Sequence, residues 1–311
     1  MAKKTKKRRG KKKLGLGGIL IVLLVALAAL LYPYIQKWID PTPDSPDPSA
    51  PTQVEGQVTI HVIDVGQADS ILLMTPAGNM LIDAGTNSSE SQLKSYLDAL
   101  GIRQFKYLVL THPHEDHIGG ADMILREYTV KNVVMPDATS TSKTFQSVID
   151  ALEASGANVI EAASGKTFSL GELACRILAP NSEKYSGTND YSVVLRATFG
   201  KVSMMFTGDA EGNKQGKSEK EILAKYTPAE LKSDFLKVGH HGSDTSTSPE
   251  FLKAVSPKIA AISVGEGNTY GHPAQSTLDA LDAAGVTYYR TDKLGSLVFV
   301  CDGETIEYRG K

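Results

Sequence analysis

From residue 107 the chain reads Tyr107-Leu108-Val109-Leu110-Thr111-His112-Pro113-His114-Glu115-Asp116-His117. The first four residues form a short apolar run, which is typical of a buried strand. After it, three of the chain's seven histidines and an aspartate fall within six residues. Imidazole nitrogens and carboxylate oxygens are ligands for zinc and similar divalent metals. The stretch therefore predicts a metal site in a cleft at a strand end. A polar loop whose histidines cap the next helix is the alternative.

Other stretches place acidic residues and histidines next to glycines and short apolar runs. They read Val62-Ile63-Asp64-Val65-Gly66-Gln67-Ala68-Asp69-Ser70, Leu81-Ile82-Asp83-Ala84-Gly85, Thr207-Gly208-Asp209, Leu236-Lys237-Val238-Gly239-His240-His241-Gly242-Ser243 and Tyr270-Gly271-His272-Pro273. With the His-x-His-x-Asp-His signature, they make the chain resemble the metallo-β-lactamase superfamily over about residues 56 to 309. The Asp-Val-Gly-Gln and Lys-Val-Gly-His-His-Gly-Ser stretches together resemble one branch, the C-terminal hydrolase-like domain of the competence DNA-uptake protein ComEC.

The resemblance implies an αββα sandwich, in which two sheets face each other with helices outside. Strand-like and helix-like segments alternate from Gly56 onward, in agreement with that architecture. The expected strands are 58–65, 70–74, 80–82, 106–110, 191–199, 202–206, 235–238, 260–264, 296–301 and 304–308. The expected helices are 89–100, 145–154, 217–226, 249–255 and 276–284.

The resemblance also implies two metal sites that share one ligand. In the superfamily, the first two histidines of the signature hold metal one, and the aspartate and third histidine hold metal two. The matching residues are His112 and His114 for metal one, Asp116 and His117 for metal two, and Asp209 as the bridge. One of His240 and His241 would complete metal two. Strand parity does not settle which, and the other could contact a phosphate or a leaving group.

The chain departs from the superfamily pattern at metal one. Many members supply a third histidine to this metal from the segment that precedes the bridging aspartate. Here no histidine lies between His117 and His240, and the matching segment contains Asn189 and Asp190. Either residue could ligate through oxygen, or metal one could be weakly held. We therefore expect two Zn²⁺ ions per chain, with Mn²⁺ as the alternative because oxygen ligands suit a harder metal.

This residue set suits hydrolysis. A divalent metal lowers the pKa of bound water from about 15.7 to about 7, so that hydroxide is available as a nucleophile at neutral pH. The candidate catalytic residues are Asp116, Asp209, His241 and His272. His272 also stands in a Gly-His-Pro stretch that could cap the following helix. Asp83 is expected to orient a ligand from beneath the metals, and the backbone and hydroxyl donors of residues 242–246 suit an anion.

Five residues have structural interpretations instead. Asp64 and Asp69 are expected to stabilise turns and loops rather than to bind metal. His61 alternates with apolar residues on a strand and is expected to be a packed or surface histidine. Cys175 and Cys301 each fall in a strand-like segment and are expected to be buried small hydrophobes, although a disulfide could join them.

The N-terminal sequence predicts a membrane tether. Nine Lys and Arg residues and no acidic residue precede Leu14, and the next 22 residues carry no charge. That length suits a transmembrane helix whose basic flank stays in the cytoplasm. The predicted parts are a basic cytoplasmic tail (1–13), a transmembrane anchor or signal sequence (14–38), a Pro-rich linker (39–55) and the hydrolase-like domain (56–311). If the segment is a signal peptide cleaved near Ala26-Leu27-Ala28, the domain is secreted.

Charge and family resemblance together narrow the function. The formal charge is −2, so the chain after its basic tail carries −11, which argues against broad electrostatic binding to nucleic acid. The ComEC resemblance implies a membrane-anchored extracytoplasmic hydrolase of phosphodiesters, whose substrate would be DNA, RNA or a phosphate-bearing envelope component. One alternative is a hydrolase of lactams, lactones or thioesters. The other is a metal-bearing DNA-binding module without catalysis.

Overall fold

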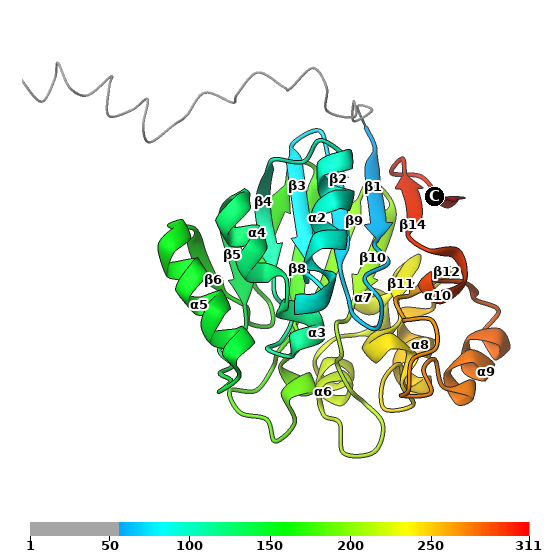
Figure 1. Cartoon of the computed structure of the whole chain (residues 1–311). Helices are drawn as coiled ribbons and strands as arrows, with labels where there is room; N and C mark the ends of the chain where they lie inside the picture. The colour runs from blue at the N-terminus through cyan, green and yellow to red at the C-terminus, as the bar shows by residue number, and fades with distance from the viewer. Residues whose placement is uncertain (1–55, 311) are drawn as a thin grey trace, which may run out of the picture. The chain divides into compact units, whose positions relative to one another are not determined.

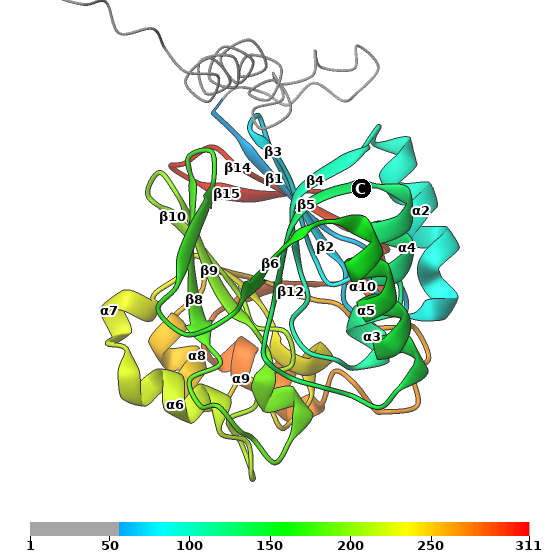
Figure 2. The same ribbon diagram turned by 90° about the vertical axis from the view of Figure 1, so that its left-hand side faces the viewer.

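Two mixed β-sheets lie face to face in the computed structural model, which describes residues 56–310 (Figure 1, Figure 2). The first sheet has eight strands in the order β15-β14-β1-β2-β3-β4-β5-β6. Their bounds are β1 (Val58–Val62), β2 (Ile71–Thr75), β3 (Gly78–Ile82), β4 (Gln104–Val109), β5 (Thr129–Met135), β6 (Asn158–Glu161), β14 (Leu297–Cys301) and β15 (Ile306–Gly310).

The second sheet has seven strands in the order β13-β12-β11-β10-β9-β8-β7. Their bounds are β7 (Thr167–Leu170), β8 (Leu173–Ala179), β9 (Val194–Phe199), β10 (Val202–Phe206), β11 (Phe235–Lys237), β12 (Ile259–Ile262) and β13 (Thr287–Arg290). Strands β10, β11 and β12 pair in parallel. Strands β3, β4 and β5 do the same in the first sheet. In each group the strands therefore end at the same edge of the sheet, and the loops that follow them start there.

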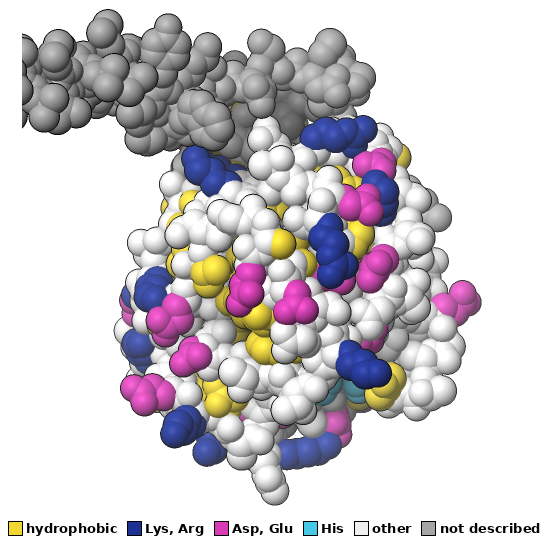
Figure 3. Space-filling view, turned by 60° about the vertical axis from the view of Figure 1, so that its left-hand side comes forward, with side chains coloured by type: hydrophobic (Ala, Val, Ile, Leu, Met, Phe, Trp, Pro, Cys, Tyr) yellow, Lys and Arg dark blue, Asp and Glu magenta, His cyan; other side chains and the backbone are white. Residues whose placement is uncertain are grey.

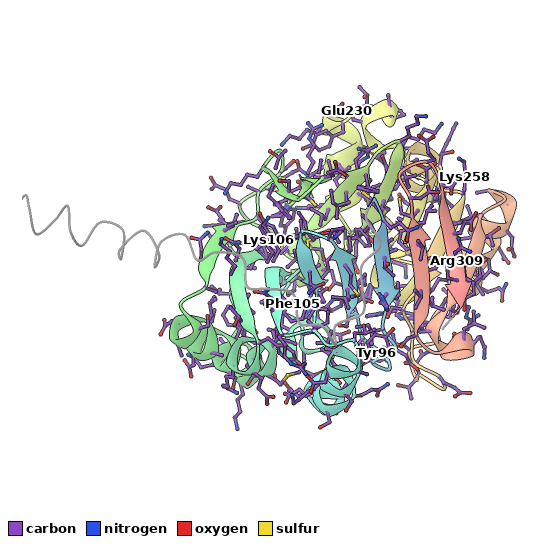
Figure 4. All side chains as sticks on the ribbon, turned by 90° about the horizontal axis from the view of Figure 1, so that it is seen from above. Tyr96, Phe105, Lys106, Glu230, Lys258 and Arg309 are labelled. Carbon is purple, nitrogen blue, oxygen red and sulfur yellow. The ribbon has the colours of Figure 1, made fainter. Side chains whose placement is uncertain are left out.

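Helices cover the outer face of each sheet. Those on the first sheet are α2 (Glu90–Ala99), α3 (Glu115–Ile118), α4 (Ala121–Glu127) and α5 (Lys143–Ser155). Those on the second are α6 (Ser218–Lys225), α7 (Pro228–Leu231), α8 (Pro249–Val255) and α9 (Gln275–Ala283), and α10 (Thr291–Leu294) follows β13. Seen from above, Tyr96 of α2 and Glu230 of α7 lie on opposite outer sides (Figure 4). Three single-turn helices, η1 (Asn87–Ser89), η2 (Thr188–Tyr191) and η3 (Gly239–Gly242), lie in loops.

Strand β2 shows why this sequence forms a sandwich. All five of its residues are buried, as expected for a strand that is covered on both faces. Ile71 and Leu73 point into the core between the sheets, where they join Phe206 and Phe299 from other strands. Leu72 points the other way and packs against the helices of the first layer. The predicted αββα sandwich is confirmed.

The parts predicted for residues 1–55 lie outside the described residues. Within residues 56–310, no helix has the length and apolar character that a membrane span requires. Both cysteines are buried and unbonded to each other, as the small-hydrophobe interpretation expects. His61 is a packed structural histidine, since it is 6% exposed and its Nδ1 lies 2.8 Å from the Tyr96 hydroxyl.

Two predicted strands are too long. The strand expected at 58–65 ends at Val62, because the Asp64 carboxylate accepts a hydrogen bond from the Gly66 N–H at 3.2 Å and closes a turn there. The strand expected at 191–199 starts at Val194, because the preceding residues form η2. Strands β5, β6, β7 and β13 were not predicted, and β8 was indicated only by the strand-like segment around Cys175. Strand β6 is mostly exposed and lacks a buried apolar face.

Candidate metal centre

Three loops far apart in the sequence converge at one end of the sandwich. His112 and His114 follow β4, and Asp116 and His117 lie in α3 directly after them. The loop after β10 carries Asp209, and η3 after β11 carries the two adjacent histidines 240 and 241. Histidine side chains reach the surface low on the face drawn in Figure 3, next to hydrophobic and charged side chains.

Four of these residues form a compact ligand set. Asp116, His117, Asp209 and His241 each offer one ligand atom, and these atoms all lie within 4.8 Å of one another. His117 Nε2 lies 3.2 Å from Asp209 Oδ2. His117 Nε2 and Asp209 Oδ1 are buried without a hydrogen-bond partner, which is costly unless a cation completes them. The donor set and its orphaned atoms therefore fit a divalent metal at the position expected for metal two.

The residues matched to metal one also lie close to Asp209. His112 Nε2 and His114 Nδ1 are 3.0 Å apart, and His112 Nε2 is 3.8 Å from Asp209 Oδ2. Burial lowers the pKa of His112 well below its usual value, and His117 adds to this effect. His112 is therefore neutral and keeps a lone pair for a metal.

Asp83 orients His117, as the sequence predicts. The Asp83 Oδ2 lies 2.8 Å from His117 Nδ1, which leaves Nε2 facing Asp209. The same carboxylate accepts hydrogen bonds from the Thr111 N–H and hydroxyl at 2.8 and 2.7 Å. Carboxylate–imidazole contacts of this kind fix the ring orientation of metal-binding histidines.

The structure distinguishes His241 from His240. Both have left-handed backbone angles, with φ of 48° at His240 and 53° at His241, so strand parity does not apply to them. His241 donates from Nδ1 to the Ser263 carbonyl at 3.0 Å and places Nε2 3.2 Å from Asp116 Oδ2. His240 is more exposed, and its Nδ1 lies 3.1 Å from the Thr245 hydroxyl and 3.3 Å from Glu211 Oε1. His241 is therefore the residue that completes the compact ligand set.

A buried ion pair behind His241 was missed by the sequence reasoning. Lys237 Nζ lies 2.6 Å from Asp69 Oδ2, and neither side chain is more than 1% exposed. Asp69 Oδ1 is 3.3 Å from His241 Nδ1. The expectation that Asp69 is not a metal ligand stays a prediction, and its carboxylate does more than stabilise a loop, because it pairs with Lys237 beside His241. A lysine inside the apolar strand at 235–238 was the signal that could have revealed the pair.

Opposite charges dominate the electrostatics of the site. Burial lowers the pKa of His241, but the Asp209 and Asp69 carboxylates outweigh it and raise that pKa to about 9. The pKa of His117 is raised well above its usual value in the same way, by Asp209 and Asp83 against the effect of burial. Burial alone would raise the pKa of Asp209, yet the two imidazoles hold it well below its usual range. Without metal, His117 and His241 therefore carry protons that a divalent cation would displace.

The two residues expected to replace the third histidine, Asn189 and Asp190, have different contacts. Asn189 donates its amide to Glu211 at 3.0 Å beside His240, and its Oδ1 is buried without a partner. Asp190 instead accepts hydrogen bonds from the backbone N–H groups of Lys217 and Ser218 at 2.9 and 3.0 Å. Asp190 therefore holds a loop, and its interpretation as a ligand is wrong. Asn189 stays a candidate.

The remaining candidates have specific contacts. His272 does not cap α9, whose N-cap is Ala274 without a side-chain cap. Its ring lies 5.5 Å from the His240 ring in an edge-to-face arrangement. Two of the hydroxyls expected to hold an anion are used internally, since Ser243 and Thr245 hydrogen-bond each other at 3.0 Å and Thr245 donates to Glu211. The buried Ser246 hydroxyl has no hydrogen-bond partner among the described residues.

Comparison with known families decides the classification. The model of the metallo-beta-lactamase superfamily matches residues 63–266, which contain every metal-ligand candidate described above. The chain belongs to the metallo-β-lactamase superfamily. Its fold and its His/Asp clusters are those of the superfamily's metal-dependent hydrolases, which hold divalent metals, often two.

Three similar proteins carry names from competence or recombination. The chain is 34% identical to ComE operon protein 3 of Bacillus subtilis, over 83% of this chain and 33% of that protein. It is 30% identical to competence protein ComA of Neisseria gonorrhoeae, over 79% of this chain and 32% of that protein. Recombination protein 2 of Haemophilus influenzae is also 30% identical, over 71% of this chain and 26% of that protein. The resemblance to ComEC-type proteins is confirmed, and the chain spans about a third of their length or less.

Solved structures support the fold. The metallo-beta-lactamase fold protein YhfI of Bacillus subtilis superposes with a TM-score of 0.54 at 13% identity, covering 79% of this chain and 99% of that one. CmlA, a diiron β-hydroxylase of Streptomyces venezuelae, superposes with a TM-score of 0.51 at 16% identity, covering 77% of this chain and 53% of that one. At such identities the likeness concerns the αββα architecture alone.

Proposed function

We propose that this protein is a metal-dependent phosphodiesterase that acts on nucleic acid outside the cytoplasm. One observation carries the proposal. The buried Asp209 carboxylate is within reach of ligand nitrogens from both groups. Its Oδ2 lies 3.8 Å from His112 Nε2 and 3.2 Å from His117 Nε2, and its Oδ1 lies 4.0 Å from His241 Nε2. A single bridge flanked by two ligand groups is the arrangement that two-metal hydrolases use.

The residues of the site would divide the work between them. His112 and His114 would hold one metal, Zn²⁺ or Mn²⁺, and Asn189 is the candidate for an additional oxygen ligand. Asp116, His117 and His241 would hold the second metal, and Asp209 would bridge both ions. Metals bound there would lower the pKa of a water molecule enough to supply a nucleophile near neutral pH.

His240 and His272 are suited to the substrate side. His240 Nε2 lies 3.6 Å from Asp209 Oδ2, and its side chain is 23% exposed, so it borders the cleft rather than the core. His272 lies next to it on the outer side. An imidazole at the edge of a metal site can contact a phosphate oxygen or protonate a leaving group.

The choice of phosphodiester rests on the relatives. Their names connect them to competence and recombination, which supports DNA as the substrate class. The missing third histidine at metal one favours a second candidate function, a metal-bearing DNA-binding module without turnover. A lactam, lactone or thioester hydrolase of the same fold is the other alternative.

A substrate panel tests the proposal. The full chain, purified without chelator and supplied with Zn²⁺ or Mn²⁺, is assayed against bis-p-nitrophenyl phosphate, single-stranded DNA, plasmid DNA and nitrocefin. We expect metal-dependent cleavage of the phosphodiesters and none of nitrocefin. Cleavage of nitrocefin alone would contradict the proposal, and a fully metallated protein without any turnover would favour the binding module.

We also propose that residues 14–38 anchor the protein in the cell membrane with residues 56–311 on the outer side. The proposal rests on the nine basic residues and the uncharged run that follows them. A phosphatase reporter fused after Lys311 is expected to be active in cells. Activity only from a reporter that works in the cytoplasm would overturn this topology, and recovery of the domain in the medium would indicate a cleaved signal.

A further inference from the structure

Tyr270 is an exposed aromatic residue at the edge of the metal centre. It lies in the loop between β12 and α9 and is 72% exposed. The described part of the chain has two other exposed large hydrophobic side chains, Val159 at 52% and Leu294 at 37%. Tyr270 is thus the most exposed of the three and the one that adjoins the candidate site.

Tyr270 is the outermost ring of a series that starts at the metal ligands. His240 Nε2 lies 3.6 Å from Asp209 Oδ2. The His240 ring is 5.5 Å from the His272 ring, and His272 stacks on Tyr270 with 5.8 Å between centroids and 24° between planes. Asp209 is buried, His240 and His272 are partly buried, and Tyr270 is exposed. Tyr270 is 72% exposed, so most of its side chain stays open to solvent beside His272.

The loop that carries Tyr270 is held in place by hydrogen bonds. Asn268 donates to the carbonyls of Gly265 and His272 at 3.0 and 2.7 Å. Its Oδ1 accepts from the N–H groups of Tyr270 and His272 at 3.2 and 3.1 Å. Gln67 fastens the same loop, since its Oε1 accepts from the Gly265 N–H at 3.0 Å. Tyr270 is therefore presented to solvent by an ordered support, so that little conformational entropy is lost when a flat ligand binds it.

We propose that Tyr270 stacks on a nucleobase that flanks the scissile phosphodiester, and that the substrate is single-stranded nucleic acid. This inference rests on the phosphodiesterase function proposed above. A phosphodiester at Asp209 would direct its neighbouring nucleotides outward over His240 and His272 to the exposed Tyr270 ring. Only an unpaired base exposes a face for such stacking, and aromatic platforms bind single strands without reading their sequence.

The charge of the chain supports stacking as a source of affinity. The residues after the basic tail carry a net formal charge of −11, so phosphate contacts alone give weak binding. Stacking does not depend on the charge of the surface. It therefore supplies affinity that the acidic body would otherwise lack.

Binding of fluorescent oligonucleotides tests the inference on the full chain. The probes are oligothymidylate and an abasic oligodeoxyribose phosphate of equal length and charge, measured by anisotropy with Ca²⁺ to suppress cleavage. Tyr270→Ala should weaken oligothymidylate binding about tenfold, the effect of losing one base–aromatic stack. Tyr270→Ala should leave the affinity for the abasic probe unchanged. The affinity of Tyr270→Phe for oligothymidylate should stay within about twofold of wild type. Val159→Ala serves as the control for loss of an exposed hydrophobic side chain. Equal affinities of wild type and Tyr270→Ala, or an equal loss on both probes, would overturn the inference.

Kinetics separate this inference from the proposed function. If the chain cleaves oligothymidylate, Tyr270→Ala should raise KM about tenfold with kcat nearly unchanged, because the stack binds ground state and transition state alike. A fall in kcat with KM unchanged would overturn the role in binding. If the metallated chain cleaves no phosphodiester, the proposed function fails, while the probe affinities still report on Tyr270. Wild-type chain that binds neither probe would refute the inference itself.

Discussion

Replacing Asp209 with asparagine removes the negative charge that joins the two ligand groups. Asp209 is 1% exposed, and its Oδ2 lies 3.2 Å from His117 Nε2 and 3.8 Å from His112 Nε2. A unit charge about 4 Å from another contributes about 4 kcal/mol at an effective dielectric constant of about 20, and a divalent ion is attracted more strongly. Asp209→Asn should therefore weaken binding of the second metal by about 10³-fold or more.

The same substitution should lower turnover by at least roughly 10²–10³-fold, as the loss of one strong transition-state interaction does. Metal content is measured by elemental analysis and turnover on bis-p-nitrophenyl phosphate, with thermal unfolding followed in parallel. Asp190→Asn is the matched control, because it removes a buried carboxylate that contacts the Lys217 and Ser218 backbone rather than the ligands. Unchanged turnover in an Asp209→Asn protein that demonstrably lacks the second metal would refute the reasoning.

Three further predictions test the supporting structure. By elemental analysis, His241→Asn should contain one metal fewer per chain, whereas His240→Asn should keep both metals. Loss of a metal from His240→Asn but not from His241→Asn would reverse the ligand assignment. Lys237→Met leaves the Asp69 carboxylate buried without its lysine partner, so the free energy of unfolding should fall by about 3–5 kcal/mol. Adding Asp69→Asn should restore most of that free energy. An unchanged free energy of unfolding in Lys237→Met would argue against the buried pair. Burial raises the pKa of Glu219 to about 7, above its value in the unfolded chain. The free energy of unfolding of the metal-free protein should therefore fall by about 3 kcal/mol between pH 4.5 and 7, as this carboxyl group ionises. Denaturant unfolding of Glu219→Gln should lack that loss, and an identical pH profile in both proteins would contradict the cause.

The sequence predicted the fold because its signals were local and strong. The short apolar runs before His112 and in β2 are typical of buried strands, and the superfamily motifs fall at strand ends where the ligands converge. Strand β6 was missed because three of its four residues are exposed and it offers no apolar stripe. Edge strands of this kind are fixed by pairing with a neighbour, here β5, rather than by their own pattern.

The site was predictable residue by residue only where a motif marked it. Asp83 was identified as an orienter of a ligand because it stands in a motif turn. The position of Lys237 in an apolar strand signals a buried ion pair, but Asp69 could not be identified as its partner, because the two residues are 168 positions apart and meet only after the two sheets pack. The choice between His240 and His241 depended on left-handed backbone angles that strand parity does not predict.

Anomalous X-ray scattering from crystals of the full chain, grown with Mn²⁺ or Zn²⁺ and recorded at the metal's absorption edge, tests the central claim most directly. We expect two peaks on opposite sides of the Asp209 carboxylate, one contacted by His112 and His114 and the other by Asp116, His117 and His241. Peaks about 3.5–4 Å apart would match a two-metal hydrolytic centre. The absence of any peak at these residues at saturating metal, or a single peak that does not touch Asp209, would contradict the account.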